Sequence, residues 1–267
     1  MKKDFSMNIY RALLNTLVQT GYVFQNYKNF VLEPHSRAII LRHDIDAQKE
    51  HSLQFARIQH EMGILGTYYF RMISQSYDPR VVEEIDSMGH EIGYHYEDVS
   101  LARGDMSKAI RLFEQHLSKL REVADVTTIC MHGSPLSKYD NRAIWKHYDY
   151  RDFGIIAEPY FDLDFTKVLY LTDTGRRWDG DNVSIRDRSA DGSINRFMSG
   201  GKKSMSDNFS FSSTHDIIRS CERGELPNQV MFTFHPQRWT DNPMLWTREL
   251  VLQNTKNVAK RLLRLAR

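Results

Sequence analysis

Short apolar runs alternate along this chain with longer segments of helical periodicity, and most of the runs end in a histidine or an aspartate. The runs are β-branched or aromatic and too short for helices, so they indicate buried strands. They lie at 37–43, 65–72, 90–96, 126–132 and 229–235, with two further ones at 152–158 and 168–173. Apolar residues at spacings of three and four predict helices between them. These helices cover 5–21, 47–62, 80–89, 104–123 and the tail from 243.

Strands that alternate with helices are typical of a parallel sheet or barrel joined by right-handed crossovers. The 267 residues are enough for one α/β domain. We therefore predict a single domain over 1–267, with a core at about 37–240 and a terminal helix at 243–267. The segment 179–211 is rich in Gly, Ser and Asp and too long for an ordinary connection, so we interpret it as an insertion or a lid.

The C-terminal ends of parallel strands share one edge, and the active sites of α/β barrels lie at that edge. Several of the predicted strands end at this edge in an aspartate or a histidine, side chains that can transfer protons or bind metals. These side chains are Asp44, Asp46, His95, His132, Asp173 and His235. The sequence therefore predicts that residues far apart along the chain meet at one site.

Composition excludes several other classes of protein. The formal net charge is only +2, which gives no nucleic-acid signature, and a hydrophobic fraction of 41% is enough for a core. Cys130 and Cys221 cannot form a disulfide framework and have no metal-type spacing. Residues 1–22 lack a continuous apolar h-region, and no run approaches the ~18 apolar residues of a membrane span. We expect a cytoplasmic protein without a transmembrane segment.

Asp44 and Asp46 end the first strand two positions apart, so in an extended strand their side chains share a face, about 7 Å apart along the backbone. His43 and Ile45 point the other way. Crowded carboxylates repel each other, and a cation, either a side chain or a metal, would relieve that repulsion. One carboxylate could then bind a metal while the other takes a proton from water. The alternative is structural, because Asp46 precedes a helical stretch and could be its N-cap.

The segment "GHEIGYHYED" contains two histidines that a regular strand would turn to opposite faces, because they are five positions apart. His95 is nearer the C-terminal end of the strand and is the candidate metal ligand, whereas His90 is expected to be a hydrogen-bonded structural residue. Glu97 and Asp98 follow directly. Either carboxylate could complete a carboxylate–imidazole set of the kind that zinc accepts.

Several segments together resemble the polysaccharide deacetylases of the NodB-homology type, carbohydrate esterase family four, in a divergent form. "ILRHDID" corresponds to the Asp-containing first motif, and "GILGTYYF" to the second strand. "SMGHEIGYH" is similar to the Gly-His-Glu-Ile-Gly-x-His second motif. "ICMHGSP" falls at the third motif, and "MFTFHP" resembles the final Leu-x-x-His motif. The resemblance covers about 37–240, with the motifs in order.

The resemblance implies a distorted barrel of parallel strands, a divalent metal that is usually zinc, and hydrolysis of N-acetyl groups on sugars. It also implies roles for particular residues. Asp44 becomes the general base, Asp46 and His95 become metal ligands, and His235 becomes the general acid. In this scheme the metal activates water and polarises the acyl carbonyl, and His235 protonates the departing amine. A strand-end histidine bonded only to backbone is the structural alternative for His235.

Three departures from the family pattern leave roles open. The second motif usually has another histidine where this chain has Val99, so Asp98 is the predicted third ligand, ahead of Glu97, with His90 an option if the strand is bulged. The first motif has aspartates two apart rather than adjacent, so the base and ligand roles of Asp44 and Asp46 could be exchanged. The third motif usually carries an arginine that pairs with the base, and here it offers only His132.

A second group of candidates surrounds "YLTDTGRRWDG" and "HPQRW". The family's fourth motif also combines an aspartate with a tryptophan, so Asp173 is expected to orient His235 and Trp178 to wall a sugar pocket. Arginine binds phosphate or carboxylate by bidentate hydrogen bonds. The predicted substrate-binding residues are His132, Arg176, Arg177, Trp178, Arg238 and Trp239. They suggest an anionic, phosphate-linked sugar, and a loop of solvated charges is the alternative.

The tail "KNVAKRLLRLAR" is basic and amphipathic. A terminal helix docked on the domain, with cations that complement its dipole, is the preferred interpretation, and peripheral contact with a membrane is the other.

These observations predict a metal-dependent hydrolase that removes an N-acyl group, expected to be N-acetyl, from an amino sugar or saccharide precursor. Two alternatives stay open. One is hydrolysis of another non-peptide C–N bond, such as a formamide or cyclic amide, and the other is a catalytically silent glycan-binding domain. The sequence leaves the sugar, the acyl group and the oligomeric state undetermined.

Overall fold

The computed structural model describes residues 3–133, 137–178 and 204–265. Its centre is a sheet in which every paired strand runs parallel to its neighbour. The strands are β1 (Val23–Gln25), β2 (Ala38–Ile45), β3 (Thr67–Phe70), β4 (Glu91–Tyr96), β5 (Val126–Met131), β6 (Leu169–Thr172) and β7 (Gln229–Phe234). Their order is β5-β4-β3-β2-β7-β6, and β1 pairs with the start of β2. The predicted parallel α/β architecture is therefore confirmed.

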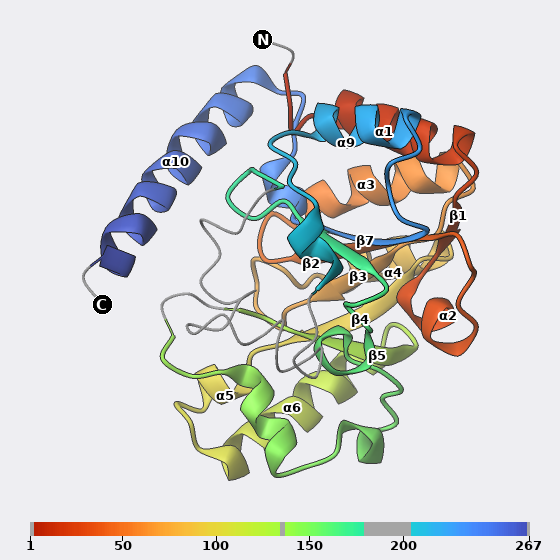
Figure 1. Ribbon diagram of the computed structural model, residues 1–267. Helices are drawn as coiled ribbons and strands as arrows, with labels where there is room; N and C mark the ends of the chain where they lie inside the picture. The colour runs from red at the N-terminus through yellow and green to blue at the C-terminus, as the bar shows by residue number, and fades with distance from the viewer. Residues whose placement is uncertain (1–2, 134–136, 179–203, 266–267) are drawn as a thin grey trace.

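Helices surround the outside of this sheet, with α1, α3 and α9 along one side and α5 and α6 at the other (Figure 1). The α-helices are α1 (Met7–Gln19), α2 (Tyr27–Leu32), α3 (Glu50–Glu61), α4 (Pro79–Ser87), α5 (Asp98–Leu101), α6 (Met106–Arg121), α7 (Pro159–Asp162), α9 (Thr214–Glu222) and α10 (Pro243–Leu265). Short 3-10 turns are η1 (Asn141–Lys146), η2 (Tyr150–Phe153), η4 (Met205–Asn208) and η5 (Pro236–Arg238). None of the helices in the described residues is long and apolar enough to cross a membrane.

The sheet is strongly curved, and this curvature decides which residues can meet. Three strand spacings separate β2 from β5, which in a flat sheet would be about 14 Å. Yet Oδ1 of Asp46, just after β2, lies 3.1 Å from Nδ1 of His132, just after β5. Within the described residues β5 and β6 are the two ends of the strand path, so the sheet is an open, barrel-like curve.

Gly93 in the middle of β4 permits close packing on the inside of the curve. A Cβ atom at this position would collide with the ring of Tyr69 on β3 and would lie 3.1 Å from the carbonyl oxygen of Thr128 on β5. Packing therefore requires glycine at this position of the "HEIGYH" segment, since any side chain there would push neighbouring strands apart.

Most of the helix boundaries have local causes in the sequence. Ser6 caps α1, Asp78 caps α4 and Asp105 caps α6, each by accepting a hydrogen bond from a backbone N–H in the first turn. Gly89 has a φ of +85° just after α4, in the left-handed region that favours glycine. In contrast, α3 starts after Lys49 without a side-chain cap. Asp46 is therefore not the N-cap of α3.

The predicted strands at 37–43, 65–72, 90–96, 126–132, 168–173 and 229–235 are present, with ends that differ by at most two positions. The prediction of a strand at 152–158 is wrong. Asp149 caps the turn η2 and Gly154 ends it with a φ of +72°, so the segment bends back. It keeps only an isolated bridge between Ala157 and Thr128.

Some elements gave no clear periodic signal, among them β1, α2 and α9, each of which is shorter than ten residues. Part of the predicted insertion or lid, 179–203, lies outside the described residues. The remaining part, 204–211, contains the turn η4.

Candidate active site

Side chains from three strand ends converge at the C-terminal edge of the sheet. The Nδ1 atom of His132 lies 3.1 Å from Oδ1 of Asp46 and 3.3 Å from Nε2 of His95. The third distance, from His95 Nε2 to Asp46 Oδ1, is 3.7 Å. Among the described residues these three form one of the groups able to hold a metal ion.

The dimensions of this group suit a small divalent cation. Bonds of about 2.1 Å at tetrahedral angles would separate the ligand atoms by about 3.4 Å. The observed separations of 3.1, 3.3 and 3.7 Å bracket that value. In addition, the buried Oδ1 atom of Asp46 has no hydrogen-bond partner among the described residues. One carboxylate and two imidazoles are a donor set that zinc accepts.

His95 is prepared to act as a ligand by its place on β4. Its Nδ1 atom donates a hydrogen bond to the carbonyl oxygen of Cys130 at 2.9 Å, which leaves the lone pair of Nε2 pointing at the site. Burial lowers the pKa of His95 to about 3, so the imidazole is neutral at physiological pH. A neutral imidazole is the form that binds metals.

His132 lies one residue beyond β5, and its backbone N–H continues the ladder by donating to the carbonyl oxygen of Tyr96 at 2.9 Å. Its Nδ1 atom faces the metal group, and its Nε2 atom faces Oε2 of Glu97 at 3.8 Å. Arg71 holds Glu97 through two hydrogen bonds to Oε1, of 2.9 and 2.6 Å. Arg71 also reaches the carbonyl oxygen of Asp46 at 3.3 Å. Glu97 and Arg71 therefore support His132 from behind.

The cation that offsets the buried negative charge of Asp44 is an arginine side chain. Arg42, two residues earlier on β2, donates from Nε to Oδ1 at 2.8 Å and from Nη2 to Oδ2 at 2.6 Å. Both residues are buried. Burial acts to raise the pKa of Asp44, but Arg42 and then His95 hold it below its ordinary value. Oδ2 of Asp44 lies 3.8 Å from His95 Nε2.

Asp46 is surrounded by imidazoles. Burial again opposes ionisation, but His132, followed by His235 and His95, holds the pKa of Asp46 well below its ordinary value. Gln237 donates to Oδ2 at 3.3 Å. The two aspartates therefore have different neighbours: Asp44 has a guanidinium, and Asp46 has open carboxylate oxygen beside histidine nitrogens.

His235 follows β7 and faces the same centre. Its Nε2 atom lies 3.8 Å from Oδ2 of Asp46, and its Nδ1 atom lies 2.6 Å from Oδ1 of Asp173. Asp173 is buried and also accepts from Arg238 at 2.7 Å and from the indole N–H of Trp239 at 2.7 Å. Burial acts to raise the pKa of Asp173, but His235 and Arg238 lower it below its ordinary value. Asp173 is thus an ionised residue held against His235.

The structure does not bring Asp98 to this group, so the prediction of Asp98 as the third ligand is corrected. α5 begins at Asp98, whose carboxylate accepts from the hydroxyl of Tyr94, 2.9 and 2.8 Å from its two oxygens, and contacts His116 at 2.8 Å. His132 has the place that Asp98 was expected to take. His90 is structural, as expected: it donates to the carbonyl of Ala56 and accepts from the amide of Gly66.

Three predicted substrate-binding residues are part of the structural framework instead. Trp178 is buried among Phe5, Phe232 and other rings, and its indole N–H donates to Thr214. Trp239 is buried completely and donates to Asp173. Arg176 is buried under Trp246 and donates to the carbonyl oxygen of that residue at 3.0 Å.

Of the other three, His132 lies in the metal group and Arg238 contacts Asp173, as described above. Arg177 has an exposed side chain.

Sequence reasoning missed three residues that support this site: Arg42, Arg71 and Gln237. The signal for Arg42 was present, because a residue two positions before Asp44 on a strand shares its face. Arg71 and Gln237 follow β3 and β7 closely, at the same edge as the predicted residues. Their charge or amide group alone did not distinguish them from solvated loop residues.

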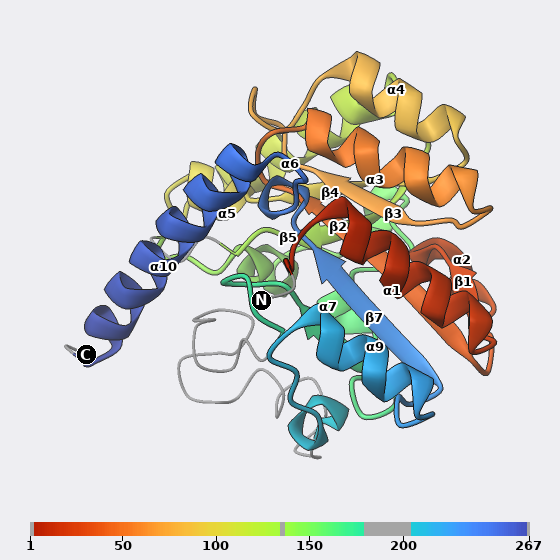
Figure 2. The same cartoon turned by 90° about the horizontal axis from the view of Figure 1, so that it is seen from above.

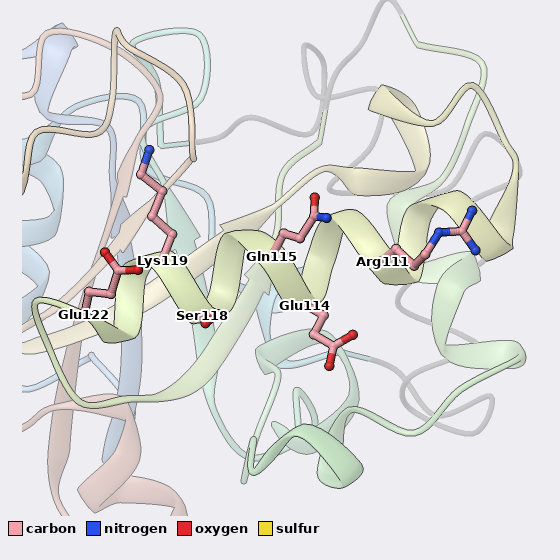
Figure 3. Close-up of a pocket in the computed structure, with 6 residues that line it drawn as sticks. All are labelled: Arg111, Glu114, Gln115, Ser118, Lys119 and Glu122. Carbon is pink, nitrogen blue, oxygen red and sulfur yellow. The ribbon is translucent and has the colours of Figure 1, made fainter.

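A separate hollow lies along the outer face of α6 (Figure 3). It is lined by Arg111, Glu114, Gln115, Ser118, Lys119 and Glu122. All of these residues belong to one helix or its C-terminal cap, and none belongs to the metal group. We interpret this hollow as a solvated helix face.

No protein-family model and no curated protein matches the chain. Solved structures that it matches include a CE4 family pseudoenzyme from Bacillus anthracis, at 11% identity and a TM-score of 0.44 over 85% of this chain. The match spans 62% of that pseudoenzyme chain. A family 4 carbohydrate esterase from Bacillus subtilis matches at 10% identity and a TM-score of 0.43, over 91% of this chain and 83% of the other.

A CE4 esterase from Streptococcus mutans matches at 14% identity and a TM-score of 0.41, over 87% of this chain and 85% of the other. These three solved structures are members of carbohydrate esterase family 4.

Proposed function

We propose that the protein is a metal-dependent hydrolase that removes an N-acyl group, expected to be N-acetyl, from an amino sugar or saccharide precursor. The observation that carries this proposal is the convergence of Asp46 Oδ1, His95 Nε2 and His132 Nδ1 within 3.7 Å of one another. Asp44, paired with Arg42, and His235, paired with Asp173, flank this group on separate strands.

Asp46, His95 and His132 would hold the ion, with zinc the expected metal. When bound, a divalent ion supplies Lewis acidity, which makes water a nucleophile near neutral pH and polarises the acyl carbonyl. The neutral state of His95 and the ionised state of Asp46 are the protonation states that this role needs.

Asp44 is the proposed general base. Its two hydrogen bonds with Arg42 hold the carboxylate in one orientation and keep it ionised, so it can accept a proton from the attacking water. Arg42 is a positioning residue in this scheme, because it acts through Asp44. It takes the part that the third-motif arginine has in the resembled family.

His235 is the proposed general acid. Asp173 accepts from Nδ1 and directs Nε2 towards the site, the arrangement needed to deliver a proton to the departing amine. The proposed acid and base therefore come from neighbouring, directly paired strands, β7 and β2, beside the metal group.

We keep a phosphate-linked sugar as a proposed substrate. Because Arg176 is buried under Trp246, Arg177 is the arginine of this pair proposed to bind the phosphate. Arg177→Ala should raise KM for phosphate-linked sugars several-fold and leave KM for neutral sugars unchanged. An equal change for both substrates would contradict this part of the proposal.

The test combines metal content with acetate release from N-acetylated amino-sugar oligosaccharides. Purified protein should bind one divalent ion per chain, and Asp46→Asn, His95→Gln and His132→Gln should each lose it together with acetate release. His147→Gln, at an exposed position, is the matched control and should retain both. Wild-type protein without stoichiometric metal would refute the proposal, and saccharide binding with metal but without acetate release would identify a glycan-binding domain.

A further inference from the structure

In the first three turns of the C-terminal helix α10, the side chains that are at least partly buried lie on one face. The helix extends from the domain along its outer edge, as both views show (Figures 1 and 2). The residues of its first three turns that are at least partly buried are Trp246, Glu249, Leu250 and Gln253. Their spacing of three, one and three places them on a single face of a helix.

Three contacts hold this inner face in place. The indole N–H of Trp246 donates to the carbonyl oxygen of Asp4 at 2.6 Å, and the guanidinium of Arg176 lies over the Trp246 ring at 4.7 Å. Arg176 also donates to the Trp246 carbonyl oxygen, as described above. The buried arginine that was expected to bind substrate is therefore an anchor for α10.

Four large apolar residues in the first three turns of α10 are exposed. Met244 is 80% exposed, Val251 59%, Leu252 43% and Leu245 39%. Leu245, Val251 and Leu252 follow Met244 by one, seven and eight positions, so the four side chains form one stripe along the helix. The sequence has Val258, Ala259, Leu262 and Leu263 at the spacing that continues this row. A helix that packed only to complete the core would turn this stripe inward.

The charge of the helix limits what can cover the stripe. From Pro243 to Leu265 the sequence has five Lys or Arg residues and one acid, a net charge of +4, whereas the whole chain has +2. The remainder of the chain is therefore slightly acidic. Two copies of α10 side by side would bring like charges together, whereas an anionic surface would attract them.

The inner face limits which side of α10 a partner can reach. An amphipathic helix can lay one apolar face into a protein groove or onto a lipid surface, and its positive charge favours an anionic lipid surface. Here the domain already covers the face of Trp246 and Gln253, so only the outer side is accessible. A lipid surface needs contact along one side alone, and a basic helix with a continuous apolar stripe is the kind that lies in such an interface.

We propose that α10 docks the protein on an anionic lipid surface, with Met244, Leu245, Val251 and Leu252 in the acyl boundary and its cations on the headgroups. This proposal is independent of the chemistry at the metal group.

The experiment is sedimentation of the full chain with sucrose-loaded vesicles of phosphatidylcholine, with and without about one third phosphatidylglycerol. Wild-type protein should sediment with the anionic vesicles and remain in solution with the neutral ones. Val251→Glu combined with Leu252→Glu should weaken binding at least tenfold. Lys260→Gln combined with Arg261→Gln should weaken it several-fold, and high salt should do the same.

Leu32→Glu is the matched control, because Leu32 is an exposed leucine (66%) on α2, away from the stripe. It should bind as the wild type does. Since all the substituted side chains in the stripe are exposed, thermal unfolding should be unchanged and serves as the check on folding.

Two results would overturn the proposal. One is equal vesicle binding by wild type and by Val251→Glu/Leu252→Glu. The other is absence of vesicle binding by a wild-type protein that is dimeric in light scattering and becomes monomeric with the same two substitutions. That second result would identify the stripe as a contact between copies of this chain.

Discussion

Arg42 and Asp44 lie two residues apart on β2 and form a bidentate ion pair, with hydrogen bonds of 2.8 and 2.6 Å, in the interior of the domain. Each side chain of this pair is at most 5% exposed. A buried carboxylate without such a partner would be costly, and breaking a buried pair leaves one charge uncompensated. The pair therefore contributes both to the fold and to the orientation of the proposed base.

Arg42→Met should lower the free energy of unfolding by about 3 to 5 kcal/mol, because Asp44 is left as a buried unpaired charge. Acetate release should fall by about 100-fold or more, since the base is no longer held. Chemical denaturation and kcat/KM measure the two effects. Adding Asp44→Asn should recover part of the stability while activity stays lost, and recovery of activity would contradict the base assignment.

Glu97→Gln should weaken metal binding by about 10- to 100-fold, the usual effect of removing the carboxylate behind a ligand histidine. The reason is the position of Glu97 Oε2, 3.8 Å from Nε2 of His132. Metal affinity can be measured by competition with a chromogenic chelator. Asp98→Asn is the contrasting variant: its carboxylate is bonded to Tyr94 and His116, so metal affinity should be unchanged. A larger loss for Asp98→Asn than for Glu97→Gln would restore Asp98 as the ligand.

Asp173→Asn should lower kcat by about 100-fold or more and leave metal content unchanged. Asp173 Oδ1 lies 2.6 Å from Nδ1 of His235, and an amide is uncharged and has one accepting oxygen where the carboxylate has two. Trp239→Phe removes only the indole donor to Oδ2 and should lower kcat by less than tenfold. Equal effects of the two variants would show that packing around Asp173, rather than its charge, supports the reaction.

Lowering the pH below 6.5 should destabilise the protein in part because of His43. This side chain is buried against Tyr68 and Thr67, and burial lowers its pKa from 6.5 to about 3. At pH 7 the ring is neutral in both folded and unfolded chains. As pH falls below 6.5 only the unfolded chain takes up the proton, so stability is lost progressively until pH approaches 3.

The contribution of His43 to this loss is about 1.4 kcal/mol per pH unit. His43→Gln should reduce the slope of unfolding free energy against pH between pH 6 and 4 by that amount, whatever its effect on stability at pH 7. Urea denaturation at a series of pH values measures the slope. His147→Gln, on the surface, should leave the slope as it is in the wild type. An unchanged slope in His43→Gln would show that the buried ring is protonated in the folded chain.

Periodicity in the sequence determined which segments are strands and which side chains lie at their C-terminal ends. Asp44, Asp46, His95 and His235 could be assigned to one edge because a parallel sheet aligns the ends of its strands. The alternation of faces also separated His95 from His90, which is bonded inside the domain. These inferences need only local geometry, and local geometry is encoded in short stretches of sequence.

The tertiary structure decided which of these residues touch. His132 contacts Asp46 although two strands lie between β5 and β2, because the sheet curves, and curvature depends on packing of side chains such as Tyr69 against Gly93. Asp98 is close to His95 in sequence but starts a helix, and its carboxylate is bonded to other side chains. Spacing along the chain specifies the direction in which side chains point within one strand or helix. Contact between side chains of different elements depends on how the whole core packs.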